Sequence, residues 1–384
     1  IRNKFFLDEG DPYNKILVNN STNEIRALGI FSNVKSETVD GSSDKSKIIN
    51  ITVTETPTGE IMAGAGTGTS GSSITFGIKE KNYLGEGTKL DANLTLSDVG
   101  IEGLFSTNIR NYKNSDKDLN TSLENSSVDQ MTNYGYKTTK TGFSIGTTYE
   151  QFKDVYFSPS FSNYYETMKT DSSASSTRKK QEGDYIDSAF NYRFILNRLD
   201  QNFQPTDGYK SSFSQSIPLV SDDYAIINAL EYAAYQSFKD DYIFGFNFLF
   251  KSANSLNGED IRASKRLYVP SRRLRGFESG KVGPIDSGDF IGGNYISVMN
   301  LTTNLPNLFT EVQNLDFTIF LDSANVWGVD FDSSLDNSKI RSATGIAVNW
   351  YTPIGPLSLS FAQPITKASS DVEETYRFDI GTTF

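Results

Sequence analysis

The chain of 384 residues contains no cysteine and no histidine. The absence of cysteine excludes disulfide bonds and thiol chemistry. The absence of histidine excludes Ser-His and Cys-His catalysis and nearly all zinc sites. We therefore expect neither a metal nor another cofactor, and we do not expect an enzyme.

Basic charge and long apolar runs are also scarce. Lysine and arginine total 36 against 47 aspartates and glutamates, which gives a net charge of −11. A surface for nucleic acid would need a basic face, so no nucleic-acid partner is expected. No apolar run approaches the ~18 residues of a membrane helix. The mean hydropathy of −0.42 is typical of a soluble protein. It fits equally a transmembrane β-barrel, whose strands alternate lipid-facing and lumen-facing residues.

Aromatic residues are abundant, at 13% of the chain, and from Gly59 onward they follow a period of two. In 242-YIFGFNFLFK-251, every second residue from Tyr242 to Phe250 is aromatic. In 315-LDFTIFLD-322, leucine, phenylalanine and isoleucine alternate with Asp316, Thr318, Phe320 and Asp322. A period of two places each set on one side of a sheet.

Such segments recur between turn-rich stretches, and sixteen of them are long enough for strands. Their even number suits an antiparallel barrel whose two ends must meet. We therefore predict an all-β fold, a 16-stranded antiparallel transmembrane β-barrel, and keep a soluble propeller as the alternative. The predicted strands are 60–69, 72–81, 87–98, 101–112, 118–128, 139–150, 153–167, 185–195, 208–218, 223–238, 241–253, 290–304, 313–322, 341–350, 356–365 and 374–384.

The N-terminal residues 1–57 have a different pattern. Residues 12–28 predict an amphipathic helix, with Pro12 near its start and Gly29 just past its end. Two short strands are expected near 30–39 and 47–55. This helix-strand-strand unit is too small for a good domain alone, so we expect it to be the C-terminal part of a module, with the barrel at 58–384. The chain begins at Ile1, and we expect a trimmed or processed fragment.

The first predicted barrel strand is rich in glycine. Gly66, Gly68 and Gly71 match the spacing of a dinucleotide-binding loop, but a strand follows them where that motif requires a helix. Glycine in a strand interior weakens the strand. Gly64, Gly66 and Gly68 therefore predict a poorly held seam where the first and last strands meet. In the last strand, the apolar residues on one face include Phe378, Ile380 and Phe384.

Two groups of acidic residues resemble sites but are interpreted as solvated. Asp330, Asp332 and Asp336 lack the glycine and the terminal glutamate of an EF-hand calcium loop. Asp222 and Asp223 point to opposite faces of a strand and cannot act together as an acid/base pair. We expect them at a strand end, at the water interface.

The long connection at about 254–289 contains the segment 271-SRRLRGFESGKVGP-284. A loop of roughly 35 residues is too long to be idle in a compact fold. The alternation places Asp322 on the lumen face of its strand. If the loop folds into the lumen, Arg275 can form a charge-assisted, bidentate pair with Asp322. Gly276 would then permit a tight bend, and Phe277 would pack against the inner wall.

At these residues the sequence resembles BamA-type outer-membrane assembly factors. Thr302 stands where several relatives have a glutamate, and 323-SAN-325 replaces the usual D-x-G context. At the N-terminal end, three segments look like the later part of the last POTRA domain of that family: 8-DEGDPYN-14, 27-ALGIFSNV-34 and 53-VTETPTGE-60. In the barrel, the matching segments are 274-LRGF-277, 291-IGGNYISVMNLTTNLP-306, 317-FTIFLDSANVWG-328, 350-WYTPIGPLSLSFAQPI-365 and 376-YRFDIGTTF-384.

The resemblance implies an insertase of the bacterial outer membrane that folds β-barrel proteins without nucleotide hydrolysis. The implied partners are nascent outer-membrane β-barrel proteins, accessory outer-membrane lipoproteins, periplasmic chaperones and the lipid bilayer. A two-partner secretion pore and a translocation-and-assembly relative of the same superfamily stay open as alternatives.

Overall fold

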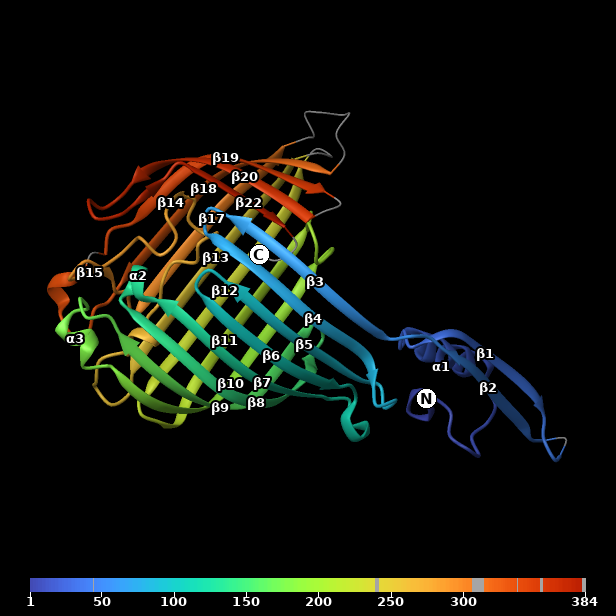
Figure 1. Ribbon diagram of the computed structural model, residues 1–384. Helices are drawn as coiled ribbons and strands as arrows, with labels where there is room; N and C mark the ends of the chain where they lie inside the picture. Colours follow the sequence, from blue (N-terminus) through green and yellow to red (C-terminus); the bar gives the residue numbers. More distant parts are fainter. Residues whose placement is uncertain (44, 239–241, 306–313, 337, 353–354, 382–384) are drawn as a thin grey trace.

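The computed structural model of the chain describes residues 1–43, 45–238, 242–305, 314–336, 338–352 and 355–381. They form a closed barrel and a small N-terminal module that projects from one end of it (Figure 1). The predicted strands 241–253, 313–322 and 374–384 each run partly into residues outside these ranges.

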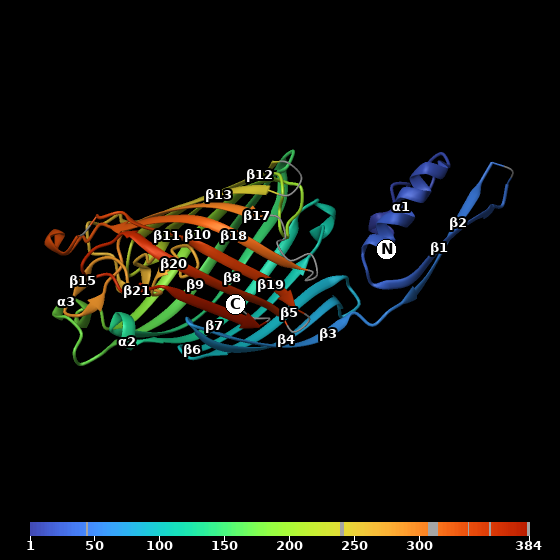
Figure 2. The ribbon, with the colours of Figure 1, turned by 90° about the horizontal axis from the view of Figure 1, so that it is seen from above.

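The N-terminal module is one helix on a two-stranded sheet, as its sequence pattern predicts. It comprises η1 (Arg2–Lys4), α1 (Lys15–Ala27), β1 (Phe31–Asp40) and β2 (Lys47–Glu55). The Asn14 side chain caps α1 by accepting hydrogen bonds from the amides of Ile16 and Leu17 at 2.9 and 3.3 Å, which satisfies donors that the first turn leaves open. The module lies beyond the end of the barrel, and the segment that leads into β3 connects the two (Figure 2).

Sixteen strands of the described residues form the closed barrel, and each pairs antiparallel with its neighbours. All sixteen predicted strands are present, so the predicted fold class is confirmed. The strands are β3 (Gly59–Gly68), β4 (Gly71–Tyr83), β5 (Thr88–Ser97), β6 (Gly100–Ile109), β7 (Asp118–Gln130), β8 (Tyr136–Phe152), β9 (Val155–Thr170), β10 (Gly183–Leu199), β11 (Gly208–Ser221), β12 (Ala225–Phe238), β13 (Tyr242–Ser255), β17 (Tyr295–Leu305), β18 (Leu315–Trp327), β19 (Arg341–Thr352), β20 (Gly355–Thr366) and β22 (Tyr376–Gly381).

The two ends of the barrel differ. The N-terminal module lies at one end, and most of the longer connections lie at the other, which we call the loop end (Figure 1). The short elements between the strands are η2 (Tyr112–Asn114), α2 (Met131–Tyr134), α3 (Ser176–Lys179), η3 (Ala263–Lys265), β14 (Gly276–Phe277), β15 (Ile285–Asp286), β16 (Asp289–Phe290), η4 (Ser333–Leu335) and β21 (Glu373–Glu374).

The outer face of the wall is apolar. Phe76, Leu123, Phe244 and Ile346 are 52, 58, 50 and 55% exposed, and they lie on β4, β7, β13 and β19, which are spread around the barrel. So many exposed large apolar side chains would be a liability in water and indicate an apolar surrounding. In the part of the chain that the structure describes, no helix is long and apolar enough to cross a membrane.

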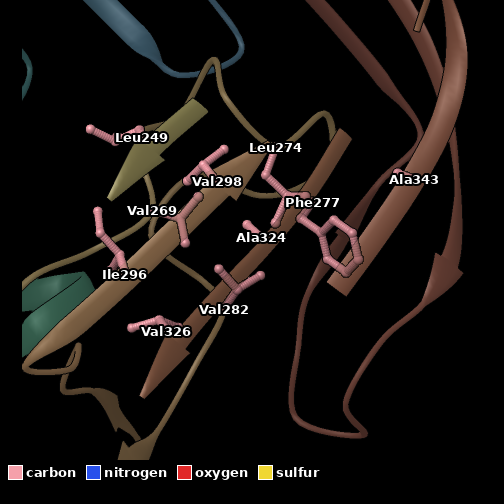
Figure 3. Packing of buried hydrophobic residues seen from close by; sticks show 10 residues of the cluster. All are labelled: Leu249, Val269, Leu274, Phe277, Val282, Ile296, Val298, Ala324, Val326 and Ala343. Carbon is pink, nitrogen blue, oxygen red and sulfur yellow. The ribbon is translucent and has the colours of Figure 1, made fainter. Parts of the chain in front are cut away.

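The connection between β13 and β17, residues 256–294, folds back into the barrel, and we call it the lumen loop. Its Val269, Leu274, Phe277 and Val282 pack against the inner wall (Figure 3). The wall side of this cluster is Leu249, Ile296, Val298, Ala324, Val326 and Ala343, from β13 and β17 to β19. A buried apolar core therefore lies inside one arc of the barrel wall.

Several predicted strand boundaries were wrong, by up to five residues; the strand expected at 313–322, for example, ends only at Trp327. The strand expected at 290–304 begins only at Tyr295, because the residues before it belong to the lumen loop. Gly292 has φ +66, a left-handed conformation that a strand does not use. Gly293 forms an isolated bridge with Leu267 of the same loop.

Candidate functional site: the lumen loop and the seam

The structure brings Arg275 of the lumen loop and Asp322 of β18 together inside the barrel. The guanidinium donates from Nε to Asp322 Oδ2 at 2.7 Å and from Nη2 to Oδ1 at 2.8 Å. The Arg275 amide donates to Oδ2 as well, at 3.1 Å. The Asp322 side chain is fully buried and that of Arg275 is 17% exposed. A bidentate pair with this burial fixes position and orientation together.

Two further residues complete the surroundings of this pair. The Asn300 side chain on β17 donates to Asp322 Oδ1 and to the carbonyl of Arg273, at 2.8 and 2.7 Å. The Arg275 guanidinium carbon lies 3.4 Å from the centre of the Phe320 ring, a cation–π contact. Asp322 thus accepts four hydrogen bonds, which offset the cost of burying its charge.

Gly276 and Phe277 follow Arg275 in the chain and allow the loop backbone to pack closely against the barrel wall. Gly276 has φ +91, and a Cβ there would lie 2.9 Å from the Cβ of Ala343 and 3.3 Å from that of Ala362. Phe277 is 1% exposed. The two residues form β14, which pairs with β21, the segment just before the last barrel strand. Sequence reasoning had expected the bend at Gly276 and the packing of Phe277, but not this two-stranded sheet.

Substituting Gly276 by alanine should undock the tip of the lumen loop. The new methyl group would enter space held by β19 and β20 and add to the strain of a positive φ. We expect the loop to become cleavable by a protease added from the loop end. Gly258→Ala is the matched control, because Gly258 has φ +80 in the same loop but no atom within 4 Å of its Cβ position. Equal cleavage of the two variants would contradict a role for the close fit at Gly276.

A second set of ion pairs holds the first part of the lumen loop. Arg262 is 2% exposed and contacts Glu166 on β9 and Asp187 on β10, at 3.0 and 2.6 Å. Lys265 contacts Asp187 at 2.7 Å and lies 3.7 Å from Asp223. The lumen loop is therefore anchored to β9 and β10 by these ion pairs and to β18 by the pair of Arg275 with Asp322. The expectation that Asp223 faces water was wrong. Asp223 is only 9% exposed, because the lumen loop with Lys265 lies against it.

Asp330 is also an anchor, which corrects the expectation of a solvated acidic loop. It forms an ion pair with Arg266 and accepts from the Ile261 amide at 2.7 Å. Burial opposes its ionisation, but Arg266 and that amide outweigh burial and hold the pKa of Asp330 below its usual value. Asp332 caps η4 by accepting from the Ser334 amide. No group of three or more potential ligands suited to a metal occurs among the described residues.

The seam lies where β22 meets β3. Within the described residues the two strands pair at only three positions, Asp379↔Gly68, Ile380↔Thr67 and Gly381↔Gly66. On its other side, β22 pairs with β20 at five positions, and β3 pairs with β4 at ten. A Cβ on Gly68 would meet the Phe378 carbonyl and Asp379.

The other predicted seam residues lie nearby. Gly64 pairs with Thr75 on β4. Phe378 accepts a hydrogen bond from the Thr69 amide at 3.0 Å, one residue past the end of β3. Phe384 lies outside the described residues.

Sequence reasoning missed Asn300, Phe320, Arg262 and Lys265, because the register across neighbouring strands and the path of the loop decide their contacts. The sequence signal that points to Arg262 and Lys265 is the stretch 262–273, which contains five basic residues and no acidic one.

Residues 82–384 match the Omp85 superfamily domain. The outer membrane protein assembly factor BamA of Neorickettsia risticii is 23% identical over 395 residues, which cover 100% of this chain and 53% of that protein. The crystal structure of BamA from Haemophilus ducreyi lacking POTRA domains 1–3 matches with a TM-score of 0.92 at 22% identity, over 100% of this chain and 81% of that one. CdiB from Acinetobacter baumannii matches with a TM-score of 0.60 at 10% identity, over 99% and 70% of the chains.

The closed sixteen-stranded wall and the loop folded into it thus define a barrel of BamA-type fold. The chain belongs to the Omp85 superfamily. It spans about half the length of the curated BamA that it matches.

Proposed function

We propose that this chain is the barrel part of an outer-membrane insertase that folds β-barrel proteins into the bacterial outer membrane. The observation that carries the proposal is the seam, where three positions pair among the described residues, beside a strand containing Gly59, Gly64, Gly66 and Gly68. The relative from Neorickettsia risticii is named as an outer membrane protein assembly factor, which supports the same function.

The physical basis of the activity is an exchange of strand pairing. A sheet edge in a membrane leaves backbone donors and acceptors without water, and each unpaired group costs several kcal/mol. A seam with few pairs costs least to open, and an incoming strand can replace the pairing that is lost. In this mechanism β3 accepts the terminal strand of a client protein, and no nucleotide takes part.

The lumen loop serves in this proposal as a fixed brace. Arg275 and Asp322 form its lock, with Gly276 and Phe277 as the tip that fits the wall. Because the lock lies on β18, away from the seam, the wall from β17 to β20 keeps its shape while β3 and β22 separate.

Residues 1–57 are proposed to be the C-terminal part of the last POTRA domain, with the barrel at 58–384. The motif resemblance supports this assignment, as does the match of the whole chain to a BamA structure that lacks POTRA domains 1–3. Nascent outer-membrane β-barrel proteins, accessory lipoproteins, periplasmic chaperones and the surrounding bilayer are the proposed partners.

Reconstitution tests the function. The chain is placed in lipid vesicles, an unfolded outer-membrane β-barrel protein is added without nucleotide, and folding is followed by the protease resistance of that client. We expect folding about ten-fold faster than in empty vesicles, a rate gain equivalent to ~1.4 kcal/mol. A client that folds at the same rate in both kinds of vesicle would contradict the proposal.

A protein-secretion pore of the same superfamily is the rival function. It requires a passage through the lumen, whereas here the lumen loop is tied to β9 and β10 on one side and to β18 on the other. Single-channel conductance separates the two functions. We expect small currents from this chain, and a large stable conductance would favour the pore.

A further inference from the structure

We propose that Arg377 is a positioning residue that connects the lumen loop directly to the last barrel strand. Docking of the loop then determines where the edge of the seam lies. This inference rests on the proposed function and names a link inside the seam. Arg377 is the second residue of β22 and points into the barrel, where it is 5% exposed.

The contacts of Arg377 lead to the tip of the lumen loop. Its Nη2 donates to the Phe277 carbonyl at 2.9 Å, and its Nη1 donates to the Ser271 carbonyl. Nε donates to Glu374 at 2.7 Å. Five guanidinium donors in a fixed fork suit several acceptors at once. The side chain thus joins the two ends of the segment 271–277, which contains the lock arginine.

The backbone reinforces the same connection. β14 pairs with β21 through Gly276↔Glu374 and Phe277↔Glu373. One residue further, the Glu278 amide donates to the Val372 carbonyl at 2.9 Å. β21 is separated from β22 by Thr375 alone, so a shift of the loop tip must move the start of β22.

Together these contacts make a continuous chain from the lock to the seam. It runs from Asp322 on β18 through Arg275 to Phe277, and from there through Arg377 into β22. Beyond Arg377 in the same strand, Asp379, Ile380 and Gly381 are the residues that pair with β3. Among the described residues, β22 therefore pairs with β20 on one side and at three positions with β3 on the other, and Arg377 ties it to the loop from inside the barrel. When the seam parts, β22 should stay with the loop.

Arg377 and Arg272 also border a cavity of about 280 Å³ inside the wall, together with Tyr351 and Asp379. Because this cavity borders β22 from the inside, side-chain packing on the inner face of the strand is incomplete. Hydrogen bonds from Arg377 replace that packing. Removing them should leave the start of β22 free to shift into the cavity.

Spin labels across the seam test the link in the absence of any client. The chain has no cysteine, so labels can be attached through Thr67→Cys and Ile380→Cys, two residues directly opposed at the seam. The fraction of molecules whose two labels lie at the short distance of the paired strands is called the register population. In Arg377→Gln we expect the register population to fall at least about two-fold, with longer distances taking its place. The control pair, Ile346→Cys with Phe361→Cys on β19 and β20, should keep its distances.

Three variants separate the link from a merely structural effect. Arg377→Lys keeps a cation that can donate to the loop carbonyls and should restore part of the register population. Glu374→Gln removes the ion pair but leaves those carbonyl bonds, and the register population should stay close to that of the parent chain. Asp322→Asn weakens the pair of Arg275 with Asp322, and it should lower the register population only while Arg377 is present.

Two results would overturn the proposal. One is an unchanged seam distance in Arg377→Gln, or in Arg377→Met if the glutamine variant does not fold. The other is an Asp322→Asn effect that is equal with and without Arg377. Because no client is used, the link can be refuted while assembly activity persists, and it can hold if the vesicle assay shows no activity.

Discussion

A covalent bond across the seam should abolish assembly of client barrels. In a chain with Thr67→Cys and Ile380→Cys, oxidation or a short bismaleimide would join β3 to β22 where they are directly opposed. Opening then requires breaking a covalent bond, so client folding should fall to the rate in empty vesicles. Reduction of the disulfide should restore it. The measurement is client folding in vesicles before and after reduction.

The control for this prediction is a cross-link elsewhere in the same wall. Ile346→Cys with Phe361→Cys joins β19 to β20, again at directly opposed residues, both exposed on the outer face. That variant should assemble clients at the parent rate when cross-linked. Full activity of the seam-locked chain would show that the barrel does not open between β3 and β22.

The second large effect is expected from breaking the lock. Arg275→Ala leaves the fully buried Asp322 carboxylate with only Asn300 and the backbone amide as donors. Removing one partner of a buried pair costs about 3–5 kcal/mol, because the remaining charge is uncompensated. We expect a loss of that order in resistance to unfolding, measured by urea titration in detergent micelles. Arg275→Ala with Asp322→Ala should cost less than the sum of the two single changes.

Lys79 with Asp91 is the matched pair for comparison. It also joins two neighbouring strands, β4 and β5, but its atoms lie 3.7 Å apart and its side chains are 46 and 36% exposed. Exposed ion pairs contribute at most about 1 kcal/mol. Lys79→Ala should therefore change unfolding little. Additive effects of Arg275→Ala and Asp322→Ala in the double-mutant cycle would mean that the lock residues do not act together.

The sequence predicted the wall well because an apolar outer face and a lumen face impose a period of two on every strand. The turns between the strands carry their own signals in glycine, asparagine, aspartate and serine. The pairing of Arg275 with Asp322 was also expected from residue parity and from the family motif. Strand alternation alone indicated which face of β18 carries the aspartate.

The rest of the site depends on contacts that no local pattern encodes. Asn300 reaches Asp322 because the register of β17 against β18 places them opposite each other. Arg377 reaches Phe277, one hundred residues away in the chain, only because the lumen loop crosses the barrel. The acidic residues Asp223 and Asp330 looked solvated because their partners, Lys265 and Arg266, belong to that same loop.

The most direct test of the account is the distance across the seam while a client is being folded. Spin labels at Thr67 and Ile380 report on β3 and β22, and labels at Ile346 and Phe361 report on the wall beside them. With a client arrested during folding, we predict a new, longer distance for the first pair and no change for the second. An unchanged distance between Thr67 and Ile380 while the client inserts would contradict opening at this seam.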